Sequence, residues 1–180
     1  YLLDRRGKHR VKISKHIEYS QNNPLYFIKN QIFATDTSGS VFKIELNKNV
    51  DKLFETNSGA DHYFIPSDLD NNRKTEFVFA SNNKLIVYDY FGKVIFSEKF
   101  PEKISFPPVI YEFSRNDKKI GVVIGKSNKI YLYNNDGSLY NGFPLQGSGM
   151  FSISSFPQLK ARFNLIVGNN DNFLYNYSVQ

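Results

Sequence analysis

The stretch GVVIGKSNKIYLYN, residues 121–134, decides the fold. In it, two short apolar runs flank a polar turn that contains Gly, Lys, Ser and Asn. Three other stretches have the same shape: QIFATDTSGSVFKI at 31–44, FVFASNNKLIVYD at 77–89 and LIVGNNDNFLYNY at 165–177. Short runs of β-branched and aromatic residues, bounded by turn residues, indicate paired β-strands.

The four stretches recur at a nearly constant interval. When Val41, Leu85, Ile130 and Phe173 are aligned, the intervals between them are 44, 45 and 43 residues. A repeat of about 40 to 50 residues that contains only strands is typical of a β-propeller blade. Helical repeats of similar length are excluded because no run has a 3.6-residue period. The sequence therefore predicts an all-β propeller with four four-stranded blades and a partial one.

The repeat also sets the expected domain organisation. We expect one propeller region over 1–180, with a partial blade at 1–14, blades at 22–56, 62–100 and 106–146, and an incomplete blade at 150–180. In the 106–146 blade, strands are expected at 109–113, 120–124, 129–133 and 139–145. Because the chain begins inside a strand pattern, we interpret it as a fragment of a larger propeller, whose other blades would be partners. Closure of the four repeats into a small ring is the alternative.

Composition excludes several classes of protein. Hydrophobic residues make up 41% of the 180 residues, with 17 Phe and 12 Tyr, which indicates a folded core rather than a disordered chain. No apolar run is long enough to span a bilayer. The absence of cysteine excludes disulfides, thiolate metal sites and a cysteine nucleophile.

The net charge of +6 raises the question of a polyanionic partner. The most basic segment lies near the N-terminus and holds Arg5, Arg6, Lys8, Arg10, Lys12 and Lys15, with His9 and His16 among them. Charges alternate with other residues from Lys8 to Lys12, as on the solvent face of an outer strand. We favour a solubilising edge over a polyanion-binding patch, and nucleic acid is not an expected partner.

The segment Asp136-Gly137-Ser138-Leu139-Tyr140-Asn141-Gly142-Phe143-Pro144-Leu145, after Tyr131-Leu132-Tyr133-Asn134, carries a family resemblance. It resembles the propeller repeats of bacterial envelope proteins of the integrin-α-like (FG-GAP) and quinoprotein-like superfamilies. The C-terminal stretch from residue 163 to 180 resembles propeller proteins of Bacteroidetes-type bacteria. The resemblance implies a location in the bacterial periplasm, at the outer membrane or outside the cell. The absence of Trp argues against a quinone cofactor.

The segment DLDNNRKTE, residues 68–76, is the candidate ion site. Oxygen-bearing side chains fall at its positions 1, 3, 5 and 9, and Ca²⁺ prefers several such hard oxygens. The resemblance to integrin-like propellers implies that Asp68, Asp70, Asn72 and Glu76 are calcium ligands. The alternative, which we favour, is a turn in which these side chains bond local backbone N–H groups or pair with Arg73 and Lys74.

No nucleophile, base and acid combination with a recognised spacing is present, so we expect no enzymatic activity. Four aromatic residues border turns and form the expected binding surface: Tyr90, Phe91, Tyr140 and Phe143. Our leading hypothesis is a non-enzymatic binding or scaffolding propeller of a bacterial envelope that recognises a protein or glycan through its loop faces. The alternatives are a hydrolase or lyase whose acids come partly from other blades, and a basic polyanion-binding propeller.

Overall fold

A computed structural model describes residues 2–3, 5–11, 17–45, 49–156 and 162–179 of the chain. Within these residues the structure is almost entirely antiparallel β-sheet, and the helix they contain is a single 3₁₀ turn, η1 (Gly125–Ser127). The described residues include no helix with the length and apolar character that crossing a bilayer requires. The all-β prediction is therefore confirmed.

The strands form four repeated sheets, each joined in sequence order by antiparallel pairing. The first sheet holds β3 (Tyr26–Ile28), β4 (Gln31–Thr35), β5 (Ser40–Glu45) and β6 (Val50–Glu55). The second holds β7 (His62–Ser67), β8 (Glu76–Ser81), β9 (Lys84–Tyr88) and β10 (Val94–Lys99). The third holds β11 (Val109–Ser114), β12 (Asp117–Ile124), β13 (Lys129–Asn134) and β14 (Leu145–Gln146). The last holds β15 (Phe151–Ser154), β16 (Phe163–Gly168) and β17 (Leu174–Val179).

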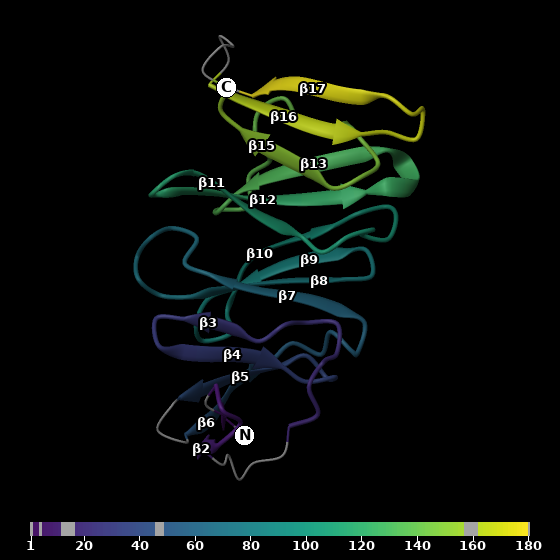
Figure 1. Cartoon of the computed structure of the whole chain (residues 1–180). Helices are drawn as coiled ribbons and strands as arrows, with labels where there is room; N and C mark the ends of the chain where they lie inside the picture. The colour runs from purple at the N-terminus through teal and green to yellow at the C-terminus, as the bar shows by residue number, and fades with distance from the viewer. Residues whose placement is uncertain (1, 4, 12–16, 46–48, 157–161, 180) are drawn as a thin grey trace.

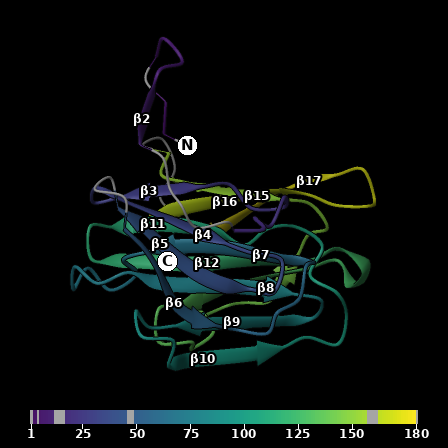
Figure 2. The same ribbon diagram turned by 90° about the horizontal axis from the view of Figure 1, so that it is seen from below.

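The four sheets stack face to face in the order of the sequence. Figure 1 shows the first sheet near the N-terminus and the last sheet at the opposite end of the stack, so the four sheets do not close into a ring. A separate hairpin of β1 (Leu2–Leu3) and β2 (His9–Val11) precedes the stack. In Figure 2, β2 projects away from the sheets. In the basic N-terminal segment, Lys12, Lys15 and His16 lie outside the described residues.

The core lies between the sheets and explains the apolar runs of the sequence. In β8, Phe77 and Phe79 pack toward the first sheet, whereas Val78 and Ala80 pack toward the third. Successive side chains of a strand point to opposite faces, so a strand between two neighbouring sheets must be apolar on both. A further core between the third and last sheets contains Leu132 and Leu165. Each interior sheet is therefore stabilised from both sides.

One predicted strand is shorter than expected. The fourth strand of the third sheet was predicted at 139–145, but β14 is confined to Leu145–Gln146. Before it, the backbone N–H of Phe143 bonds to the carbonyl of Tyr140 at 3.1 Å, which turns the chain out of the extended conformation. Pro144 follows and has no N–H to donate to a neighbouring strand.

Because the strands of each sheet run antiparallel, the loops and turns that connect them gather at two opposite ends of the stack. The loop 68–75 between β7 and β8 lies at one end, together with the turn 89–93 between β9 and β10. We call residues 68–76, the loop with Glu76 at the start of β8, the 68–76 loop, and this end of the stack the 68–76 end. The β8–β9, β12–β13 and β16–β17 turns lie at the opposite end. Figure 1 shows the last two of these turns on the same side of the stack.

Candidate functional site

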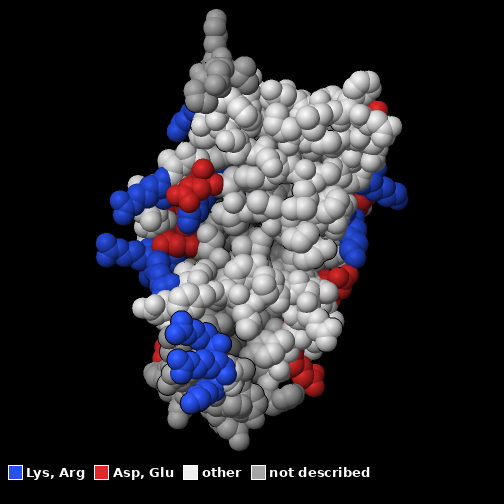
Figure 3. Space-filling model, in the orientation of Figure 1, with Lys and Arg blue, Asp and Glu red and all other residues white. Residues whose placement is uncertain are grey.

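Loops at the 68–76 end form two neighbouring cavities on either side of one loop. The first, which we call the basic pocket, has a volume of about 380 Å³ and is lined by Lys29, Gln31, Arg73, Lys74, Thr75, Tyr90 and Phe91. The second, the acidic pocket, has a volume of about 230 Å³ and is lined by Leu69, Asp70, Glu76, Ile95, Asn135 and Asp136. The 68–76 loop contributes residues to both pockets. Figure 3 shows basic and acidic side chains along both edges of the stack, with a largely uncharged face between them.

The loop is anchored to both neighbouring sheets by lysines. The Lys29 Nζ lies 2.8 Å from the Asp68 Oδ2 across the boundary with the first sheet. The Lys118 Nζ donates to the Asp68 carbonyl, also at 2.8 Å, across the boundary with the third sheet. A third contact joins the Asn71 Nδ2 to the Asn116 Oδ1 at 2.7 Å. The loop therefore has a fixed position relative to three sheets.

Three of the four predicted calcium ligands converge. Carboxylate oxygens of Asp68, Asp70 and Glu76 lie within 4.8 Å of one another. Glu76 is buried, with 5% of its surface exposed, and its Oε2 accepts the N–H of Leu69 at 2.7 Å. Burial, opposed by that N–H and reinforced by the two neighbouring carboxylates, raises the pKa of Glu76 to about 7.

The fourth predicted ligand, Asn72, is engaged in the turn itself. Its Oδ1 accepts the N–H of Lys74 at 2.7 Å, and its Nδ2 donates to the Asp70 Oδ2 at 2.8 Å. The Asp68 Oδ2 accepts the N–H of Arg73 at 3.1 Å, whereas the buried Asp68 Oδ1 has no hydrogen-bond partner. The three carboxylates fit a hard cation in donor chemistry. The Asn72 amide oxygen is also a hard donor, but the N–H of Lys74 already occupies it. Calcium binding stays a prediction from the sequence.

The basic pocket brings together two of the four aromatic residues predicted to form a binding surface. Tyr90 and Phe91 come from the β9–β10 turn, and their ring centroids lie 5.6 Å apart in an edge-on arrangement. Phe91 has 73% of its surface exposed. The turn that presents it is fixed because the Asp89 Oδ1 accepts the N–H groups of Phe91 and Lys93.

The other two aromatic residues do not form the expected exposed surface. Phe143 is buried in the core between the third and last sheets, because the 140–143 turn folds its ring back into that core. Tyr140 is partly buried and packs edge-on against Phe113, with a centroid distance of 5.5 Å. The Lys119 Nζ lies 5.1 Å from the centroid of the Tyr140 ring.

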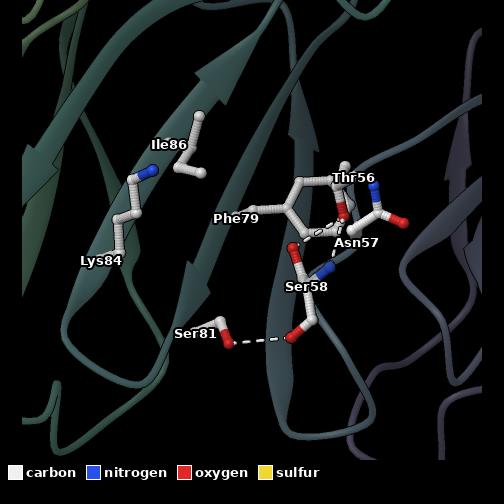
Figure 4. A pocket seen from close by; sticks show the side chains of 7 residues that line it. All are labelled: Thr56, Asn57, Ser58, Phe79, Ser81, Lys84 and Ile86. Atoms are coloured by element: carbon white, nitrogen blue, oxygen red, sulfur yellow. Dashed lines mark hydrogen bonds between the residues drawn. The ribbon is translucent and has the colours of Figure 1, made fainter.

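A third cavity, of about 200 Å³, lies at the opposite end of the stack between the first and second sheets. Figure 4 shows its lining, with hydroxyl groups that bond to their neighbours. Thr56 and Ser58 hydroxyls lie 2.7 Å apart, and the Ser81 hydroxyl donates to the Ser58 carbonyl at 3.0 Å. These mutual bonds reduce the polar groups open to a ligand, so this cavity is the weaker candidate. Its lining includes a single charged side chain, that of Lys84.

Aspartates in the tight turns accept hydrogen bonds from backbone N–H groups of the same turn. The Asp36 Oδ1 accepts the N–H groups of Ser38 and Ser40, both at 2.9 Å. Hydrogen bonds from the hydroxyl and N–H of Ser138 hold the pKa of Asp136 below its ordinary value. Hydrogen bonds from the Tyr175 hydroxyl and the Phe173 N–H likewise lower the pKa of Asp171. Carboxylates held in this way stabilise turns as anions.

Comparison with known proteins defines the class of fold. No protein-family model matches the sequence, and no curated protein matches it. Among solved structures, the computationally designed Ika4 protein is similar with a TM-score of 0.59 and 15% identity over 97% of this chain and 99% of that one. BBS1N, solved in complex with ARL6DN, gives a TM-score of 0.60 and 10% identity over 89% of this chain and 52% of that one.

A third similar structure is that of streptogramin B lyase, with a TM-score of 0.51 and 14% identity over 93% of this chain and 57% of that one. The chain thus spans nearly all of the designed protein and just over half of the other two. Together with the repeated four-stranded sheets, these similarities place the fold in the β-propeller class. At such low identity they carry no information on function.

Proposed function

We propose that this chain is a non-enzymatic binding propeller that recognises a protein or glycan through its 68–76 end. The observation that carries the proposal is the basic pocket, where the exposed ring of Phe91 and the ring of Tyr90 stand beside three cationic side chains. Its volume of about 380 Å³ lies within the range of roughly 300 to 1,000 Å³ typical of ligand pockets. An exposed aromatic ring on a fixed turn offers a partner a large contact area at little entropic cost.

The state of the acids supports binding rather than hydrolysis. Glycoside hydrolysis needs two carboxyl groups on either side of an open substrate site. Asp36, Asp136 and Asp171 instead accept hydrogen bonds within their own turns. Asp70, which lines the acidic pocket, accepts hydrogen bonds from the N–H and the amide of Asn72, and Asp68 is paired with Lys29.

We also propose that the protein acts in a bacterial envelope, in the periplasm, at the outer membrane or after secretion. This part of the proposal rests on the resemblance of the repeats to envelope propellers. It predicts that an export signal stands upstream in the encoding gene. A complete coding sequence without such a signal would contradict it.

Two exposed phenylalanines allow a matched test of the binding proposal. Phe91, at the 68–76 end, is 73% exposed, and Phe173, in the β16–β17 turn at the opposite end, is 69% exposed. Wild type, Phe91→Ala and Phe173→Ala are applied to a glycan array and to a displayed peptide library. Ligands of the wild type are expected to bind Phe173→Ala and to be lost with Phe91→Ala.

Two outcomes would contradict the proposal. One is equal loss of binding in both variants, which would show that the 68–76 end has no special role. The other is conversion of a bound ligand into a cleaved or eliminated product, detected by mass spectrometry after incubation with the wild type. Thermal unfolding of each variant checks that lost binding does not reflect lost folding.

A further inference from the structure

The cations of the basic pocket differ in how far they are neutralised. Lys29 is paired with Asp68. Across the part of the chain that the structure describes, neither the Arg73 guanidinium nor the Lys74 ammonium forms an ion pair with an acid. Both residues are exposed on the loop. The pocket therefore has two positive charges available to a ligand.

The acids of the same loop are kept away from this pocket. Asp70 and Glu76 line the acidic pocket on the other side of the loop. Asp68 is engaged by the ammonium of Lys29 and by the N–H of Arg73. The loop thus places its cations and its acids in different pockets. An anion in the basic pocket would lie next to cationic side chains, and no carboxylate of the described residues lines that pocket.

The remaining lining adds flat apolar surface and neutral hydrogen-bonding groups. Tyr90 and Phe91 provide the aromatic rings, and Gln31 provides an amide beside the largely buried Thr75. A sugar ring has an apolar face suited to an aromatic ring and hydroxyl groups suited to amides and hydroxyls. A carboxylate or sulfate on such a sugar suits the guanidinium of Arg73.

We propose that the basic pocket binds an acidic glycan, a chain whose sugars carry carboxylate or sulfate groups. The proposal rests on the proposed binding function and specifies its ligand. Arg73 and Lys74 hold the acidic group, Phe91 and Tyr90 cover the face of the ring, and Gln31 contacts a hydroxyl. The open pocket, with a volume of about 380 Å³, suits a few sugar units better than a long polyanion that is bound only by its charge.

Calorimetry with defined oligosaccharides tests the proposal. The probes are an oligogalacturonate, a sulfated oligosaccharide, and the carboxyl-reduced form of the first, which has the same backbone without charge. At least one acidic probe is expected to bind, and the neutral form at least about tenfold more weakly, as expected from the loss of a charged hydrogen bond. Raising the salt concentration is expected to weaken binding moderately, because only two cations are involved.

Variants locate the site. Arg73→Gln, Lys74→Gln and Phe91→Ala are each expected to raise the Kd of the acidic probe by about tenfold. The matched control is Lys84→Gln, which removes an exposed lysine from the cavity at the opposite end and is expected to leave the Kd unchanged. Thermal unfolding confirms that each variant is folded.

Several results would overturn the acidic-glycan proposal. They are equal affinity for the neutral probe, equal loss with Lys84→Gln, no binding of any acidic probe, or tighter binding of polyglutamate or single-stranded DNA. Competition by inorganic sulfate as strong as by the sulfated probe would mean that only an ion binds. If neutral sugars bind equally and Phe91→Ala removes that binding, the proposed binding function stands and only its acidic specificity fails. If Phe91→Ala and Phe173→Ala weaken ligand binding equally, the binding function itself fails.

Discussion

Gly92 lies directly against the side chain of Phe54 in the preceding sheet. A Cβ atom added to Gly92 would lie 2.6 Å from the Phe54 Cγ, and the glycine has a φ of +84°. The next sheet repeats the relationship, with Gly137 at a φ of +88° against the side chain of Phe96. In both cases the turn after the third strand of one sheet packs on an aromatic residue in the fourth strand of the sheet before it.

This contact predicts a large cost for Gly92→Ala. A left-handed backbone costs a residue with a Cβ about 1–2 kcal/mol, and overpacking adds about 1–3 kcal/mol. Gly142→Ala is the control, since its φ is +86° but no atom lies within 4 Å of the added Cβ. Denaturant unfolding should show a larger loss of stability for Gly92→Ala and Gly137→Ala than for Gly142→Ala. Equal losses in all three would mean that the aromatic contact adds nothing.

Lys118 is expected to stabilise the stack through its hydrogen bond to the Asp68 carbonyl. Lys118→Met removes the ammonium and keeps most of the apolar stem, and should lower the free energy of unfolding by about 1–2 kcal/mol. Lys99→Met, at the exposed end of β10, makes the same chemical change at a lysine that has no hydrogen bond to another sheet within the described residues. If both variants unfold at the same denaturant concentration, the bond between the sheets contributes nothing measurable.

The fold was predictable because the residues that define the repeat lie close together in the sequence. The short apolar runs, such as Phe77-Val78-Phe79-Ala80, and the Asn, Asp and Gly residues of the turns are local features, and they recur every 43 to 45 residues. Whether the sheets close into a ring was harder to predict from the sequence, because ring closure depends on small rotations between neighbouring sheets. The shortened fourth strand at residue 145 was missed because a turn inside an apolar stretch resembles a strand.

Only the part of the candidate site that comes from a single loop could be predicted from the sequence. Asp68, Asp70 and Glu76 converge as their spacing in one loop suggested, whereas the Asn72 amide is taken by the backbone of the same turn. The basic pocket was missed because its lining comes from segments around Lys29, Arg73 and Tyr90, which are far apart in the sequence. Turn composition marked Phe91 correctly as exposed, but it could not show that Phe143 folds back into the core.

The calcium prediction can be tested directly on the three converging carboxylates. If Ca²⁺ binds to Asp68, Asp70 and Glu76, calcium should raise the melting temperature, because a ligand that binds the folded state stabilises it. EDTA should reverse the increase, and Asp70→Ala should abolish it. Asp61→Ala removes an exposed acid that pairs with Lys103 and serves as the control. A melting temperature unaffected by calcium would leave the loop as a hydrogen-bonded turn.

Glu76 should make stability depend on pH. Its pKa is raised from an ordinary value of 4.5 to about 7 in the folded protein, chiefly by burial, so its ionisation opposes folding. Below about pH 4.5 the carboxyl is protonated in both the folded and unfolded states, and it imposes no penalty. The penalty develops as the pH rises from about 4.5 to 7 and is complete above pH 7.

Glu76→Gln isolates this contribution, since the amide cannot ionise and its oxygen can still accept the N–H of Leu69. Relative to wild type, the variant should gain free energy of unfolding as the pH rises, with the largest gain at pH 8 and little at pH 4.5. Denaturant unfolding at pH 4.5, 6 and 8 measures the difference, with the exposed Glu112→Gln as the control for the change in net charge. A difference between Glu76→Gln and wild type that is the same at all three pH values would mean that Glu76 ionises as freely in the folded protein as in the unfolded chain.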